Sequence, residues 1–344
     1  MRLRIKSLIN RALSSNSISI PALPFVLPYS FTKGKLSILM YHGVVRQPLA
    51  VSDWCFISET NFRRQMEYLK TNFEVFSLTE AINALKFNSI HRPTAVITFD
   101  DGYQNVFDVA FPILHELKLH ATVFLNTAFV GTANTVWFCR LIQAITMTSH
   151  TSLSWQNSTF DISTSKAKAT TSAILQSRLK QLDHDDLLKE LEEIIKSLEV
   201  TVDFIAPSSS FQILGREAIQ YMMASNLIEF GAHTDNHTIL THIPIVKARQ
   251  EIEQSIQAVR KFTGQPCRLF AYPNGRSEDY NTDIINILKD TGITAALTTR
   301  VGPNTVDTPL FELRRYPIGA NLGMVPFQLQ VHHVLARLQN FIRA

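Results

Sequence analysis

Short apolar runs that alternate with helical stretches dominate the chain from Leu36 onward. Each run is rich in β-branched and aromatic residues, which is typical of a buried strand, and the stretches between the runs show apolar residues at helical spacing. Strands joined through a helix pair in parallel, because the chain must cross over between them. The alternation therefore predicts an α/β fold with a largely parallel sheet.

The predicted elements follow one another along most of the chain. Strands are expected at residues 37–41, 73–77, 94–99, 121–125, 227–232, 269–272, 294–298 and 313–318. Helices are expected at residues 61–71, 78–86, 103–117, 246–262 and 282–291, and the last two are followed by the C-capping glycines Gly264 and Gly292.

Residues 132–210 interrupt this alternation and are predicted to be an insertion. A serine- and threonine-rich part precedes a charged helical run at residues 176–198, whose leucines and isoleucines fall on one face. Residues 36–320 are expected to form one barrel that carries this insertion, since such barrels take from about 200 residues upward. We expect a basic, proline-containing segment before it at residues 1–35 and a helical tail after it at residues 321–344.

The N-terminus opens with basic residues and continues into a stretch broken by Pro21, Pro24 and Pro28. These prolines disfavour a transmembrane helix, and a signal peptide is not favoured either. Either a basic amphipathic helix on anionic lipid or a frayed terminus fits the pattern. A cytoplasmic or membrane-peripheral location is the expectation, with secretion or a periplasmic location as the alternative.

Charge and cysteine usage exclude some functions. The chain has 33 basic and 29 acidic residues and no basic stripe, so nucleic acid is not an expected partner. Cys55, Cys139 and Cys267 lie far apart without a CxxC pair, which predicts buried thiols rather than a disulfide framework or a cysteine-based zinc site.

Two adjacent carboxylates end the apolar run AVITF. Asp100 and Asp101 follow it, and Gly102 comes next. Residues at the carboxyl end of a barrel strand lie at the face of the barrel where the active site is found. Asp and Gly are also favoured in an ordinary strand-to-helix turn. This motif alone therefore fits a structural turn as well as a catalytic site.

A second strand end carries two histidines, His233 and His237, in IEFGAHTDNHTIL. No Glu follows His233, so the motif is not the HExxH motif of metalloproteases. Together with a carboxylate from another strand, two imidazoles make the open three-ligand site that a catalytic zinc needs. One of the two aspartates could then bind the metal while the other takes a proton from water. The spacing does not say which aspartate does which.

Three motifs in this order, TFDDGY, HTDNH and FAYPNG, resemble the polysaccharide deacetylase family, also called the NodB-homology or carbohydrate esterase family 4 domain. The resemblance spans about residues 36–318. It implies a distorted (β/α) barrel that binds a divalent metal, commonly Zn²⁺, and removes acetyl groups from N-acetylated sugars. Asp and His ligands also suit Co²⁺, Ni²⁺ or Fe²⁺.

The same resemblance assigns roles. Asp100 matches the catalytic base, and Asp101, His233 and His237 match the metal ligands. In the third motif, Ala271 stands where the family usually has an arginine that orients the base.

Another arginine must then take that place. Arg268, Arg314 and Arg315 are the candidates, and Arg315 is preferred. Tyr103, Tyr272, Pro273 and Asn274 are expected to shape the substrate groove.

The family's C-terminal histidine motif is not evident, because His332 and His333 lie beyond the predicted barrel. His42, in ILMYHGV, instead resembles the N-terminal histidine of the poly-N-acetylglucosamine deacetylase branch, where it acts as general acid. The expected substrate is an exopolysaccharide that contains N-acetylhexosamine. Two alternatives stay open: a hydrolase of another acylated amide or ester, and a glycan-binding protein without catalysis.

Overall fold

The computed structural model describes residues 32–201 and 210–334. The basic N-terminal residues, for which membrane contact is a prediction, lie outside these ranges. Within the described residues, the main sheet has eight strands, and all of its pairs are parallel, as predicted. In spatial order they are β11 (Ala295–Leu297), β10 (Leu269–Ala271), β9 (Ile228–Ala232), β6 (Ala121–Leu125), β5 (Thr94–Phe99), β1 (Leu36–Tyr41) and β12 (Tyr316–Pro317), with β4 (Glu74–Val75) beside β5.

The two ends of this strand order meet through one segment. Leu313 forms a parallel bridge with Leu297 of β11, and three residues later Tyr316 of β12 pairs with Leu39 of β1. The segment therefore links the two edge strands, and the sheet curls into a distorted (β/α) barrel. Because the strands are parallel, their carboxyl ends all open onto the same end of the barrel.

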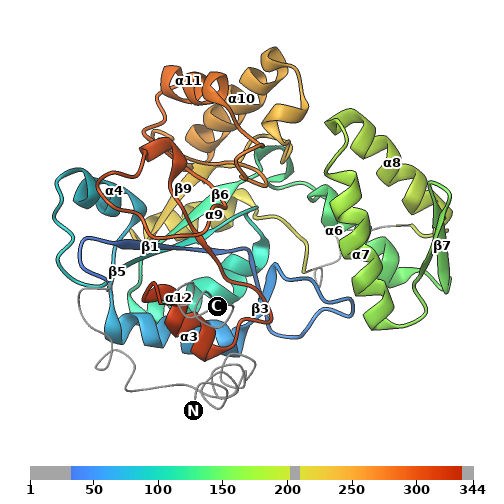
Figure 1. Ribbon diagram of the computed structural model, residues 1–344, viewed down its shortest axis with the longest axis horizontal. Helices are drawn as coiled ribbons and strands as arrows, with labels where there is room; N and C mark the ends of the chain where they lie inside the picture. The colour runs from blue at the N-terminus through green and yellow to red at the C-terminus, as the bar shows by residue number, and fades with distance from the viewer. Residues whose placement is uncertain (1–31, 202–209, 335–344) are drawn as a thin grey trace, which may run out of the picture.

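Helices cover the outside of the barrel (Figure 1). Within the described residues they are α3 (Glu59–Asn72), α4 (Leu78–Lys86), α5 (Phe111–Leu117), α9 (Arg216–Ala224), α10 (Ile245–Thr263), α11 (Thr282–Asp290) and α12 (Met324–Val331). Figure 1 shows α10 beside α11 on one side and α3 beside α12 on the other. A short parallel pair, β2 (Gly43–Val45) and β3 (Phe56–Ser58), follows β1.

The helix predicted at residues 103–117 is split in the structure. A π-helical turn, η2 (Val106–Ala110), precedes α5. Pro112 has no N–H, so it cannot donate to the carbonyl of Asp108 four residues earlier. Arg46 Nη2 donates to that carbonyl oxygen instead, at 2.8 Å. The proline thus accounts for the irregular turn, and the arginine satisfies the carbonyl group that it leaves free.

The segment predicted as an insertion forms a helical unit to the right of the barrel in Figure 1. It contains α6 (Trp137–Met147), an antiparallel hairpin of β7 (Ser152–Trp155) and β8 (Ser158–Asp161), α7 (Ser165–Leu179) and α8 (His184–Ser197). The continuous helix predicted at residues 176–198 is wrong, because the chain turns between Leu179 and His184. The turn lets Leu179 and Leu191, on different helices, both be buried in the core.

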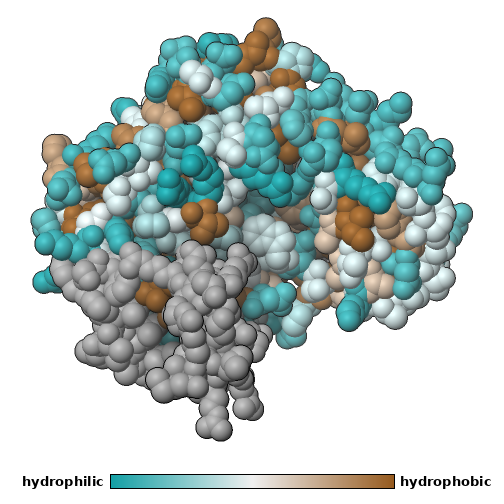
Figure 2. All heavy atoms as spheres, in the orientation of Figure 1, coloured by the Kyte–Doolittle hydropathy of each residue, from teal (hydrophilic) through white to brown (hydrophobic). Residues whose placement is uncertain are grey.

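Apolar side chains do not form one continuous patch on the face seen in Figure 2, where brown residues appear as separate spots. The exposed large apolar residues come from several elements; Phe87, Val246 and Val301 are examples. In the ranges that the structure describes, no helix is both long and apolar enough to cross a bilayer.

Candidate active site

A small cavity of about 70 Å³ lies at the carboxyl ends of the strands. The residues that follow β1, β5, β9 and β10 line it: His42, Asp100 with Asp101, His233 and Asn274. Parallel strands bring these side chains together although up to 232 positions separate them along the chain. The site is therefore a product of the strand order.

Arg315 holds Asp100 in a fixed orientation. Its Nη1 and Nη2 donate to Asp100 Oδ1 and Oδ2 at 2.7 and 2.8 Å, while its Nε donates to the carbonyl oxygen of Thr298 at 2.9 Å. Both partners are almost fully buried. Burial by itself would raise the pKa of Asp100, but the Arg315 guanidinium and the nearby histidines lower it to about 2. Asp100 is therefore an ionised carboxylate in a bidentate ion pair.

Asp101, His233 and His237 converge on one point. Asp101 Oδ1 lies 3.6 Å from His233 Nε2 and 3.4 Å from His237 Nε2, and all three residues are buried. Two ligands that each bind a tetrahedral cation at about 2.1 Å are separated by about 3.4 Å. The spacing of the three side chains therefore fits a shared divalent cation.

The tautomer of His233 supports the same conclusion. A carbonyl oxygen only accepts, so the 2.7 Å contact between His233 Nδ1 and the Ala271 oxygen places the proton on Nδ1. In the neutral ring, Nε2 then presents a lone pair to a carboxylate oxygen. Burial lowers the pKa of His237 to about 3, so the His237 ring is neutral. A lone pair that faces a carboxylate oxygen favours a cation between the two atoms, and a hydrogen bond on the other ring nitrogen, which His233 makes, is typical of histidine ligands.

The backbone at these strand ends is unusual. Asp101, Thr234, His237 and Asn274 all have φ between 57° and 68°. Left-handed backbone is uncommon outside glycine, and for the β-branched Thr234 it is a clear outlier. Such conformations concentrate at functional sites, where the surrounding structure stabilises them.

Glu251 of α10 and Asn126 after β6 fix the ligand loops, and neither was expected from the motifs. Glu251 Oε2 accepts hydrogen bonds from the backbone N–H groups of Asp235 and Asn236, both at 2.9 Å. Asn126 Nδ2 donates to Asp101 Oδ1 at 3.1 Å. A polar residue directly after a strand was a usable signal for Asn126, whereas nothing local marks Glu251.

Comparison with known proteins agrees with this geometry. The family model described as polysaccharide deacetylase matches residues 88–296, which is more than half of the chain. The chain belongs to the polysaccharide deacetylase family. The matched range includes both aspartates, both histidines and the third motif.

Individual relatives match a shorter part of this chain. Poly-beta-1,6-N-acetyl-D-glucosamine N-deacetylases of Staphylococcus epidermidis and Staphylococcus aureus are each 32% identical over 79 residues. The match covers 23% of this chain and 27% of each relative, so it spans only about a quarter of their length.

Solved structures extend the likeness to the whole fold. The Streptococcus pyogenes deacetylase PplD has a TM-score of 0.57 at 20% identity, over 86% of this chain and 96% of that one. IcaB from Ammonifex degensii has a TM-score of 0.56 at 20% identity, over 88% and 97%. The predicted fold class, a distorted (β/α) barrel of the NodB type, is confirmed.

His42 lines the same cavity as the two aspartates. Its ring packs edge-on against Trp54, with 4.9 Å between ring centroids, and both residues line the cavity. Burial lowers the pKa of His42, although the charges of Asp101 and Asp100 partly oppose the effect. Trp54 is 45% exposed and forms a flat apolar surface at the cavity.

The inserted unit supplies one wall of the same cavity. Phe138 of α6 and Gln176 and Lys180 of α7 line it together with the metal-ligand candidates. Gln176 Nε2 donates to Asp53 Oδ2 at 3.2 Å, which joins α7 to the loop that carries Trp54. No sequence motif predicted these residues, because only the packing of the insertion brings them to the site.

Several aromatic residues expected in the groove lie elsewhere. Tyr103 and Tyr272 are fully buried, and their hydroxyls bond to Cys139 Sγ and to the Phe311 carbonyl. Pro273 is also buried and does not line the cavity. These three assignments are corrected: the three residues are buried and do not line the cavity. Of the four expected groove residues, Asn274 alone lines the cavity, and its Nδ2 donates to Asp279 Oδ2.

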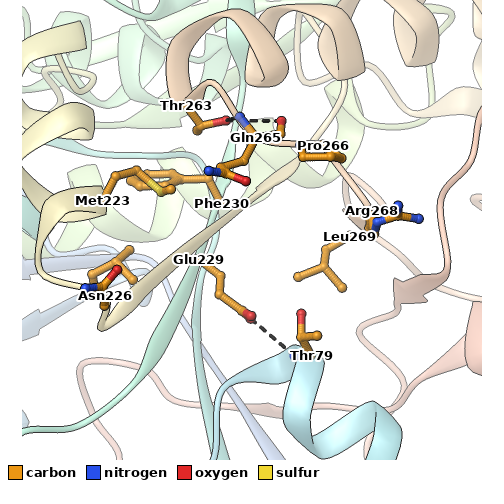
Figure 3. Close-up of a pocket in the computed structure, with 11 residues that line it drawn as sticks. Thr79, Met223, Asn226, Glu229, Phe230, Thr263, Gln265, Pro266, Arg268 and Leu269 are labelled. Carbon is orange, nitrogen blue, oxygen red and sulfur yellow. Dashed lines mark hydrogen bonds between the residues drawn. The ribbon is translucent and has the colours of Figure 1, made fainter.

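A larger cavity of about 340 Å³ lies at the opposite end of the barrel, between the amino ends of β9 and β10 (Figure 3). Its carboxylate, Glu229, accepts hydrogen bonds from Thr79 N at the start of α4 and from Thr122 Oγ1. Arg268, one of the three arginines considered for Asp100, lines this cavity and is exposed. It is therefore too remote to orient the base.

Proposed function

We propose that this deacetylase is a metal-dependent hydrolase that removes N-acetyl groups from a polysaccharide containing N-acetylhexosamine. One observation carries the proposal: Asp101, His233 and His237 converge beside a second carboxylate, Asp100, that Arg315 fixes in place. The family resemblance and the names of the staphylococcal relatives support this substrate class.

Asp101, His233 and His237 would hold the cation, and Zn²⁺ suits this donor set best. When bound, such a cation polarises a carbonyl group and lowers the pKa of a water molecule. Asp100 is the proposed general base, since it is ionised and its orientation is fixed. Arg315 is the proposed positioning residue for Asp100 and replaces the arginine that the third motif lacks at Ala271.

His42 is the proposed general acid. An amine leaves far more easily than an amide anion, so the departing nitrogen needs a proton, and such acid catalysis is typically worth about 10² to 10⁴ in rate. His42 faces both carboxylates, whose charges favour its imidazolium form, whereas burial favours the neutral ring. In this proposal the ring carries its second proton only during turnover. The products are acetate and a free amino sugar.

Acetate release from a panel of acetylated glycans tests the proposal, with chelator and then with metal added back. We expect release that depends on the metal, and in Asp100→Asn a fall of at least about 10²-fold with metal content unchanged. Undiminished turnover in Asp100→Asn would refute the base assignment. Activity on small acyl esters but not on N-acetylglucosamine oligomers would favour the other hydrolase, and glycan binding without acetate release would favour a binding protein.

A further inference from the structure

The inserted unit places a positive charge at the catalytic cavity. Lys180, at the C-terminal end of α7, lines the cavity together with His237 and Asp101 and is half-buried. Gln176, which also lines the cavity, lies one helical turn before it. This lysine is not part of any of the motifs that define the family resemblance.

Lys180 has no carboxylate partner in the part of the chain that the structure describes, whereas many surface lysines and arginines do. The nearby carboxylate of Asp53 is already engaged. Its Oδ1 accepts a hydrogen bond from Cys55 N at 2.9 Å, and its Oδ2 accepts one from Gln176. This half-buried ammonium group is therefore available to pair with an anion that enters the cavity.

The other charges of the cavity do not offset this lysine. Asp100 is paired with Arg315. Asp101 would balance only one of the two charges of a divalent cation. The cavity of the loaded enzyme is thus net positive, so it attracts anions and disfavours free amino sugars.

We propose that Lys180 binds the carboxylate of a uronic acid residue next to the N-acetylhexosamine that is deacetylated, so that the preferred substrate is an acidic heteropolysaccharide. A single ammonium group matches a single carboxylate, whereas a phosphate is better served by several donors or an arginine fork. Trp54, which also lines the cavity, would pack against the sugar ring. This inference rests on the proposed function and specifies its substrate.

The test compares two oligosaccharides that differ in one group. One alternates glucuronate with N-acetylglucosamine, and the other is the same oligosaccharide with each carboxylate reduced to an alcohol. Acetate release gives kcat/KM for each, and calorimetry on the Asp100→Asn variant gives each Kd without turnover. Lys180→Met keeps most of the apolar stem, Lys180→Gln keeps a polar end, and Lys166→Met on the exposed part of α7 is the matched control.

We expect the wild type to favour the acidic oligosaccharide about tenfold in kcat/KM and Kd, and this preference to shrink with salt. Both Lys180 variants should lose the preference, because kcat/KM and affinity fall more for the acidic than for the reduced oligosaccharide, while Lys166→Met keeps it. Equal kcat/KM and Kd for both oligosaccharides in the wild type would overturn the inference. An equal fall in kcat/KM on both oligosaccharides in the Lys180 variants would overturn it as well. If no acetate forms from either, the proposed function fails, and the Kd comparison still decides the role of Lys180.

Discussion

The two ends of the barrel each hold a cavity, and the larger cavity is not the one with the chemistry of an active site. The cavity at the amino ends of β9 and β10 holds about 340 Å³, and the one at the carboxyl ends holds about 70 Å³. Yet the smaller cavity contains the convergent aspartates and histidines, buried groups with shifted pKa values and left-handed backbone. At the larger one, Glu229 is bonded to its own neighbours. Convergent chemistry, rather than volume, identifies the functional end.

Removing a metal ligand should give the largest effect at the carboxyl end. We expect His237→Ala to lose bound metal and to lower acetate release by at least about 10²-fold, because two ligands hold a cation poorly. Metal content per protein and acetate release measure the two effects. His115→Ala, on the exposed side of α5, is the control and should change neither. Full metal content in His237→Ala would remove this residue from the site.

Weakening the orientation of Asp100 should lower activity less than removing a metal ligand. Arg315→Lys keeps the positive charge but cannot form the bidentate pair with Asp100. We expect kcat to fall about 10- to 100-fold with KM nearly unchanged, since Arg315 acts through the base. Urea unfolding should separate this from a loss of stability. The neighbouring Arg314→Lys serves as control, and an unaltered kcat in Arg315→Lys would contradict the positioning role.

Removing the exposed indole should affect binding alone. Trp54→Ala removes a flat surface beside His42, and we expect KM to rise about three- to tenfold, the size of an aromatic contact of about 0.5–1.5 kcal/mol. Phe87→Ala is matched to it, because Phe87 is 80% exposed and lies outside the cavity. Measuring KM with an N-acetylglucosamine oligomer for both variants tests this prediction. If both variants behave alike, Trp54 does not contact the substrate.

The amino end should respond in stability only. Glu229→Gln keeps the shape of the side chain but removes the charge that accepts from Thr79 N at the start of α4 and from Thr122 Oγ1. We expect the free energy of unfolding to fall by about 1 kcal/mol, with acetate release unchanged. A denaturant titration and the acetate assay measure the two. A marked loss of acetate release in Glu229→Gln would contradict the conclusion that the amino end of the barrel affects stability only.

The sequence by itself determined the parallel sheet and the residues at its strand ends. Apolar runs at residues 94–99 and 121–125 became strands with those same bounds, because buried parallel strands have a strong local signature. The same pattern placed Asp100, Asp101 and His233 at the carboxyl end of the barrel. The break in the run at residues 176–198 and the short β12 were not predicted, since packing sets both.

Only the tertiary structure decided which distant groups meet. Arg315 reaches Asp100 because the segment from Leu313 to Tyr316 closes the barrel beside β1. Lys180 and Trp54 reach the cavity because the inserted unit packs against the loop that precedes β3. Tyr103 and Tyr272 carry the same aromatic chemistry but are buried. Local periodicity fixes the element on which a residue lies, whereas the closure and packing of those elements fix which side chains face one another.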